Sequence, residues 1–117
     1  MAKKILVVDD EPDVRDYLTS YLEDEGYETR TAEDGNVAME RVAEERPDLI
    51  LLDLQMPEQT GTGFYRTLHH KSEYKDIPVI VISGLAGRDV AVSKSVPVFE
   101  KPIEKEDLLS AIKKAIG

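Results

Sequence analysis

Residues 4–12, KILVVDDEP, join a run of four apolar residues, Ile5–Val8, directly to Asp9, Asp10 and Glu11. An unbroken apolar run of this length is typical of a strand in a parallel sheet that helices cover on both faces. The proline that follows the acids suits the first turn of a helix. This stretch therefore predicts a buried strand, a turn that carries three acids, and a helix.

The alternation of apolar runs with helical patterns continues along the chain. The segment Tyr27–Thr31 alternates between apolar and polar residues, as in an edge strand. Further continuous apolar runs, each typical of a buried strand, occupy Leu49–Leu52, Val79–Ile82 and Val96–Phe99. Apolar residues recur at helical spacing in the segments Val14–Leu22, Val37–Val42, Phe64–Leu68 and Leu108–Ile116. The stretch Gly84–Ser95 leaves room for one more, short helix. The β-α unit is then repeated five times, which predicts an α/β protein with a parallel sheet and helices on both of its faces.

The composition limits the class of protein. The chain has 117 residues, enough for one domain, and its 41% hydrophobic and 33% charged residues are ordinary for a globular protein. It has no cysteine, which is consistent with the expected cytoplasmic location. No apolar stretch is long enough for a membrane span, and the N-terminal residues lack the apolar region of a signal peptide. The net charge of −9 argues against direct binding to nucleic acid or to anionic membranes.

Polar side chains follow four of the five predicted strands. In an open parallel sheet, ligands bind beyond the carboxyl ends of the strands, so residues at these positions converge on one edge. They are Asp9, Asp10 and Glu11 after the first strand, Asp53 after the third, Ser83 after the fourth and Lys101 after the fifth.

These residue types together indicate phosphoryl chemistry. Carboxylates that lie close together repel one another, and a divalent cation removes that conflict. Oxygen ligands without histidine or cysteine favour Mg²⁺, which keeps coordination positions free for phosphate oxygens. Asp53 is the candidate nucleophile because carboxylates form aspartyl phosphates. Lys101 would supply positive charge to the phosphoryl oxygens, and Ser83 would donate a hydrogen bond to one of them.

Three segments resemble the receiver domain of two-component response regulators. They are VVDDEP at 7–12, LLDLQMPEQTG at 51–61 and VFEKP at 98–102. The resemblance covers nearly the whole chain and implies one receiver domain over residues 1–117. It implies a flavodoxin-like, three-layer α/β/α fold whose parallel sheet has five strands in the order 2-1-3-4-5, with five helices.

The resemblance also implies roles for individual residues. Asp53 would accept a phosphoryl group from a sensor histidine kinase or a phosphotransfer protein, and Lys101 would pair with that group. Mg²⁺ would be held by Asp10, Asp53 and the backbone carbonyl of Gln55, with Asp9 assisting through water. Pro102 would follow a cis peptide bond, an isomer that is largely confined to proline.

The expected switch passes from the phosphoryl group to a distant surface. By resemblance, Ser83 would turn toward the phosphoryl oxygens and Phe99 would rotate inward. The segment between Ser83 and Lys101 is a few residues shorter than is usual in the family, so we expect a shortened fourth helix within Gly84–Ser95. The downstream partner surface is then expected to differ from that of the transcription-factor receivers.

The same residues allow alternative interpretations. Asp9 and Asp10 could be helix-capping residues, Asp53 and Ser83 turn residues, and Lys101 a solvated lysine. A P-loop hydrolase would require a glycine-rich loop after the first strand, which is absent here. The remaining alternative is a pseudo-receiver, a scaffold that binds a protein partner without being phosphorylated.

The resemblance also sets expectations for activity and partners. We expect a regulator that is phosphorylated and dephosphorylated on itself, not an enzyme with a separate substrate. It would be a monomer or a weak phosphorylation-dependent dimer, and its downstream protein partner is not named by the sequence. Since the chain stops directly after the last predicted helix, it is expected either to act through other proteins or to be a fragment of a longer regulator.

Overall fold

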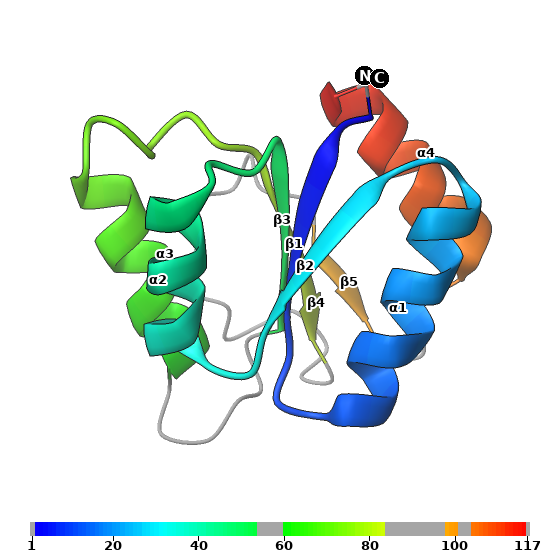
Figure 1. Cartoon of the computed structure of the whole chain (residues 1–117), viewed down its shortest axis with the longest axis horizontal. Helices are drawn as coiled ribbons and strands as arrows, with labels where there is room; N and C mark the ends of the chain where they lie inside the picture. Colours follow the sequence, from blue (N-terminus) through cyan, green and yellow to red (C-terminus); the bar gives the residue numbers. More distant parts are fainter. Residues whose placement is uncertain (1, 54–59, 84–97, 101–103, 117) are drawn as a thin grey trace.

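The computed structural model describes residues 2–53, 60–83, 98–100 and 104–116. Strands and helices alternate along these residues (Figure 1). The strands are β1 (Lys4–Val8), β2 (Glu28–Ala32), β3 (Leu49–Asp53), β4 (Val79–Ser83) and β5 (Val98–Glu100). The helices are α1 (Pro12–Asp24), α2 (Gly35–Glu44), α3 (Thr60–His70) and α4 (Lys105–Ile116). None of these helices is long and apolar enough to cross a membrane.

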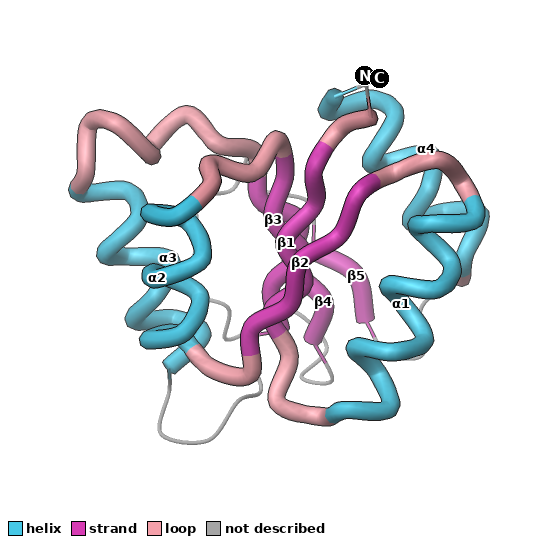
Figure 2. The backbone as a smooth tube through the Cα atoms, viewed as in Figure 1, coloured by secondary structure: helices cyan, strands magenta, loops and turns pink. Residues whose placement is uncertain are grey.

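The strands form one parallel sheet in the order β2-β1-β3-β4-β5. Helices α2 and α3 cover one face of the sheet, and α1 and α4 cover the other (Figure 2). The predicted parallel α/β architecture is therefore confirmed, and β2 is an edge strand as expected. The shortened fourth helix was predicted within residues 84–95, which lie outside the described residues, so the expected count of five helices stays a prediction.

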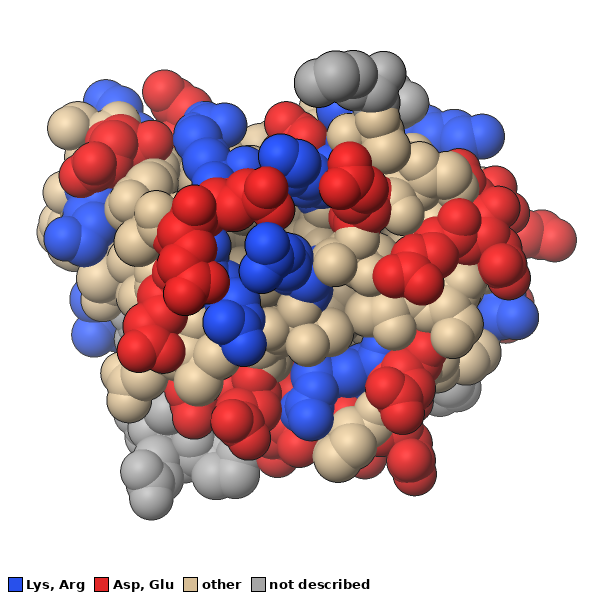
Figure 3. All heavy atoms as spheres, viewed as in Figure 1, with Lys and Arg blue, Asp and Glu red and all other residues tan. Residues whose placement is uncertain are grey.

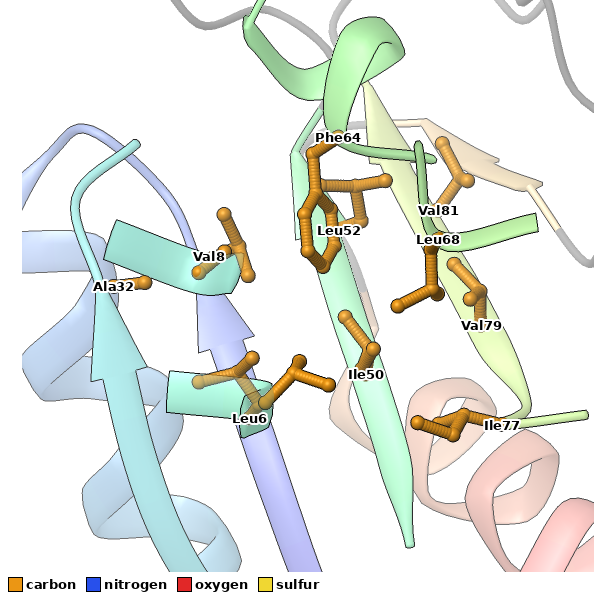
Figure 4. Close-up of a cluster of buried hydrophobic side chains, with 12 residues drawn as sticks. Leu6, Val8, Ala32, Ile50, Leu52, Phe64, Leu68, Ile77, Val79 and Val81 are labelled. Atoms are coloured by element: carbon orange, nitrogen blue, oxygen red, sulfur yellow. The ribbon is translucent and has the colours of Figure 1, made fainter. Parts of the chain in front are cut away.

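Alternate residues of each central strand enter two different cores. Leu6 and Val8 of β1 pack with the side chains of α2 and α3, whereas Ile5 and Val7 pack with those of α1 and α4. Figure 4 shows Phe64 of α3 close to β3 in the first of these cores. Because both faces are apolar, the strands are continuous hydrophobic runs in the sequence.

Helix α1 ends in a turn that explains why β2 begins one residue later than predicted. Gly26 has a φ of 94°, which glycine adopts without the steric cost that other residues incur. Its N–H donates to the Glu23 carbonyl at 3.0 Å, and the N–H of Tyr27 donates to the Leu22 carbonyl at 3.1 Å, as in a Schellman motif. Tyr27 is buried in the same core cluster as Leu22. Its apolar side chain therefore packs at the end of α1 and is not part of a strand. The second strand was predicted to start at Tyr27; it starts at Glu28.

Lys105, the first residue of α4, contacts two tyrosines of α1. Its ammonium group lies 5.1 Å from the ring centroid of Tyr17 and 5.4 Å from that of Tyr21. The hydroxyl of Tyr21 donates a hydrogen bond to the backbone carbonyl of Lys105 at 3.2 Å. Tyr17 is 46% exposed. Lys105 covers part of this ring through a cation–π contact.

An ion-pair network lies where the chain enters β1, at the end of the sheet opposite the predicted site. Lys4 Nζ is 3.0 Å from Glu45 Oε2, and Arg30 contacts the other oxygen of Glu45 at 3.5 Å. Figure 3 shows basic side chains bordered by acidic ones on this face. The hydrogen bond from Lys4, followed by the positive charges of Lys4 and Arg30, lowers the pKa of the Glu45 carboxyl.

This lowered pKa predicts a pH-dependent contribution to stability. Glu45 contributes above its ordinary pKa of 4.5, and the contribution is lost as the pH falls through the lower folded-state value. We therefore expect Glu45→Gln to destabilise the protein at about pH 7 and to destabilise it less near pH 3.5. Urea unfolding at both pH values measures this, with Glu40→Gln on the exposed face of α2 as the control. A Glu45→Gln effect of equal size at both pH values would contradict the account.

Candidate functional site

The turn between β1 and α1 is held by hydrogen bonds to Asp9. Its backbone N–H donates to the Ala32 carbonyl of β2 at 3.1 Å. Its carboxylate oxygen Oδ1 accepts from the backbone N–H of Glu11 at 2.9 Å. Its backbone carbonyl accepts a 2.6 Å hydrogen bond from the guanidinium of Arg15 on α1. Asp9 is only 2% exposed, so these bonds replace contacts with water.

The three acids of this turn, Asp9, Asp10 and Glu11, are here called the acid turn. One carboxylate oxygen from each lies within 4.8 Å of the others. Asp9 is buried, Asp10 is half-buried and Glu11 is exposed, so the cluster opens toward solvent on one side. The Glu11 backbone is extended at the N-cap of α1, and its side chain makes no capping hydrogen bond. The carboxylates gathered here suit a hard divalent cation, for which oxygen is the preferred ligand.

Strand register brings the end of β3 next to the acid turn. Val8, the last residue of β1, pairs with Leu52 of β3. The residues that follow this pair, Asp9 after the end of β1 and Asp53 at the end of β3, therefore stand at about the same level. Asp53 is the last residue of β3 and pairs with Ile82 of β4. The sequence placed Asp9 and Asp53 at one edge of the sheet, and the backbone register agrees with that placement.

The same register continues to the far strands. Ser83, the last residue of β4, pairs with Glu100, the last residue of β5. Phe99 lies one position earlier on β5, opposite Ile82. The backbones at Asp53, Ser83 and Phe99 therefore lie near the carboxyl edge of the sheet. Their side chains lie outside the described part of the structure, as do the predicted site residues Gln55, Lys101 and Pro102.

The histidines of α3, His69 and His70, are both exposed at the end of that helix. Arg15 was not predicted from the sequence to be a site residue. Its position near the start of α1, six residues after Asp9, was the available signal, since the helix begins beside the acid turn.

The chain matches the family of response regulator receiver domains over residues 5–113. It belongs to this family. Receiver domains are signalling regulators of two-component systems, and they typically bind Mg²⁺ at an acidic site. The acid turn of this receiver domain is an acidic cluster in which one carboxylate oxygen of each residue lies within 4.8 Å of the others.

Individual relatives agree with this assignment. Protein Rrf1 of Nitratidesulfovibrio vulgaris is 33% identical over 117 residues, which cover 100% of this receiver domain and 85% of Rrf1. The nitrogen assimilation regulatory protein NtrX of Azorhizobium caulinodans is 36% identical over 120 residues, which cover 99% of this chain but 26% of NtrX. The chemotaxis protein CheY4 of Vibrio cholerae has a similar structure, with a TM-score of 0.87, 29% identity and coverage of 98% of this chain and 99% of CheY4.

Proposed function

We propose that this receiver domain, residues 1–117, is the phosphoacceptor switch of a two-component phosphorelay. Asp53 would take a phosphoryl group from a phosphohistidine of a sensor histidine kinase or a phosphotransfer protein. The observation that carries the proposal is the strand register, which sets Asp53 level with Asp9 at the edge where the acid turn lies. Acids that accumulate at one end of a sheet repel one another, which suits a site that gathers a cation and then a phosphoryl group.

The transfer needs no substrate other than the donor. An oxygen of the Asp53 carboxylate would attack phosphorus, forming the P–O bond of an acyl phosphate while the P–N bond of the phosphohistidine breaks. The bonding electrons pass to the imidazole nitrogen, and the ring leaves neutral when its other nitrogen carries a proton. Hydrolysis of the acyl phosphate would return Asp53 to its starting state and reset the switch.

The acid turn would hold Mg²⁺ together with Asp53. Its carboxylate chemistry fits this ion, with Asp10, Asp53 and the Gln55 carbonyl as direct ligands and Asp9 acting through water. When bound, Mg²⁺ would neutralise the acids and the phosphoryl oxygens that approach them. Asp9 is suited to an indirect role because its Oδ1 already accepts the Glu11 N–H.

The remaining predicted residues would convert phosphorylation into a change of surface. The added phosphoryl group brings about −1.5 to −2 charges and three acceptor oxygens. Lys101 would pair with these oxygens, Ser83 would hydrogen-bond to one of them, and Phe99 would follow inward. The altered surface would then bind a downstream protein partner, in the cytoplasm, as a monomer or a weak dimer.

Intact mass after incubation with acetyl phosphate tests the phosphoacceptor function. We expect one added phosphoryl group when Mg²⁺ is present and none when the Mg²⁺ is chelated before acetyl phosphate is added. Asp16 is an exposed acid of α1, and the control variant Asp16→Asn should gain the same phosphoryl group as the wild type. A folded protein that gains no phosphoryl group would instead favour the pseudo-receiver, a scaffold that binds its partner without phosphorylation.

Ser83→Ala separates phosphorylation from its transmission. We expect Asp53 to remain phosphorylatable in this variant, because the serine hydroxyl is not the nucleophile. Partner binding should depend less on phosphorylation, because one inward-directed hydrogen bond is missing. The measurement is partner affinity with and without acetyl phosphate, once a partner is in hand. Equal phosphorylation dependence in the variant and the wild type would rule out the switch role of Ser83.

A further inference from the structure

We propose that Arg15 is a positioning residue that fixes the acid turn and thereby sets its affinity for the divalent cation. This inference rests on the proposed function, because it concerns the same site. Arg15 lies on α1 and reaches back to the turn from the helix side.

Arg15 contacts the acid turn through both its backbone and its side chain. The guanidinium nitrogen NH1 donates to the Asp9 carbonyl at 2.6 Å. The backbone N–H of the same arginine donates to the Glu11 carbonyl at 3.1 Å, in the first turn of α1. Asp10 lies between these two anchored residues, so both bonds restrain the backbone that carries its carboxylate.

The bond from the guanidinium is the one that a mutation can remove. A charged donor makes a shorter and stronger hydrogen bond than a neutral one, in keeping with the 2.6 Å distance. Asp9 is 2% exposed. Without Arg15, its carbonyl would therefore lose this partner in a place that water reaches poorly, and the turn would have to shift to satisfy it. Such outer partners hold metal ligands in the orientation that binding requires.

The positive charge of Arg15 would affect Mg²⁺ affinity in the opposite direction to its hydrogen bond. A cation near the acid turn repels another cation, so a purely electrostatic role would make Mg²⁺ bind more tightly when the charge is removed. A positioning role makes Mg²⁺ bind more weakly, because the carboxylates are no longer preorganised. The sign of the change in affinity therefore distinguishes the two roles.

The test is a Mg²⁺ titration followed by the backbone amide signals of the acid turn, on wild type, Arg15→Met and Arg15→Lys. We expect Arg15→Met to bind Mg²⁺ about tenfold more weakly. Arg15→Lys should also bind it more weakly, because it keeps the charge without the guanidinium geometry. At saturating Mg²⁺, the rate of phosphorylation by acetyl phosphate should return close to that of the wild type, so the loss lies in cation affinity.

Arg41→Met is the matched control. Arg41 also donates to a backbone carbonyl, that of Thr31 at 3.2 Å, and its removal changes the net charge by the same amount. Its Mg²⁺ affinity should equal that of the wild type.

Two results would overturn the role of Arg15. The first is that folded Arg15→Met binds Mg²⁺ as tightly as the wild type or more tightly. The second is that Arg41→Met loses as much Mg²⁺ affinity as Arg15→Met. If Arg15→Met does not fold, Arg15→Lys decides, and wild-type affinity in that variant overturns the proposal. A wild-type protein that binds no Mg²⁺ and gains no phosphoryl group would overturn the proposed function itself, which is a different outcome.

Discussion

We expect Asp53→Asn to abolish phosphorylation by acetyl phosphate, leaving the intact mass unchanged in the presence of Mg²⁺. An asparagine side chain is nearly the same size as aspartate, but its amide is a poor nucleophile and carries no charge for the cation. Asp53 ends β3, level with the acid turn. The expected effect is therefore complete loss of the adduct, and not a slower approach to the same amount.

The control for Asp53→Asn is the fold of the variant. Its urea unfolding midpoint should be as high as that of the wild type or higher, since one of several neighbouring negative charges is removed. If Asp53→Asn unfolds at a lower urea concentration than the wild type, Asp53→Glu is the deciding substitution. Its longer carboxylate should also accept little or no phosphoryl group. An adduct on folded Asp53→Asn as large as on the wild type would show that another residue is the acceptor.

Leu51→Ala is the substitution with the largest expected cost in stability. Leu51 is 1% exposed in the centre of β3, in the core that α1 and α4 share with the sheet. Removing its buried methyl groups should lower the free energy of unfolding by about 3 kcal/mol, through lost burial and the cavity left behind. Total stabilities of about 5–15 kcal/mol make this a large fraction.

Urea unfolding measures the effect of Leu51→Ala. Lys114→Ala on α4 is exposed and should change the free energy of unfolding by less than about 0.5 kcal/mol. An effect of Leu51→Ala as small as that of Lys114→Ala would mean that β3 is not covered by α1 and α4 as described.

The sequence was most informative where chemistry and topology coincide. Carboxyl ends of parallel strands share one edge of a sheet, so the runs before Asp9 and Asp53 were enough to place these acids together. The register between Val8 and Leu52 agrees with that placement. Buried strands were also predictable, because a continuous apolar run of four residues between turn residues is typical of a strand that is covered on both faces.

Other features depend on contacts that leave no pattern in the sequence. Tyr27 was assigned to a strand because its burial against Leu22, across the end of α1, looks the same in the sequence as burial in a sheet. The role of Arg15 was missed because its partner is a backbone carbonyl, which every residue possesses. The predictions for Gln55, Lys101, Pro102 and the fourth helix concern residues outside the described ones and stay predictions.

Peptide mapping of the protein after reaction with acetyl phosphate and Mg²⁺ identifies the residue that carries the phosphoryl group. The chain has 24 aspartates and glutamates, and we expect the phosphoryl group on one of them, Asp53. The acids of the acid turn should carry none, because in the proposed function they hold the cation. A phosphoryl group on Asp9, Asp10 or Glu11, or one spread over many acids, would contradict the account.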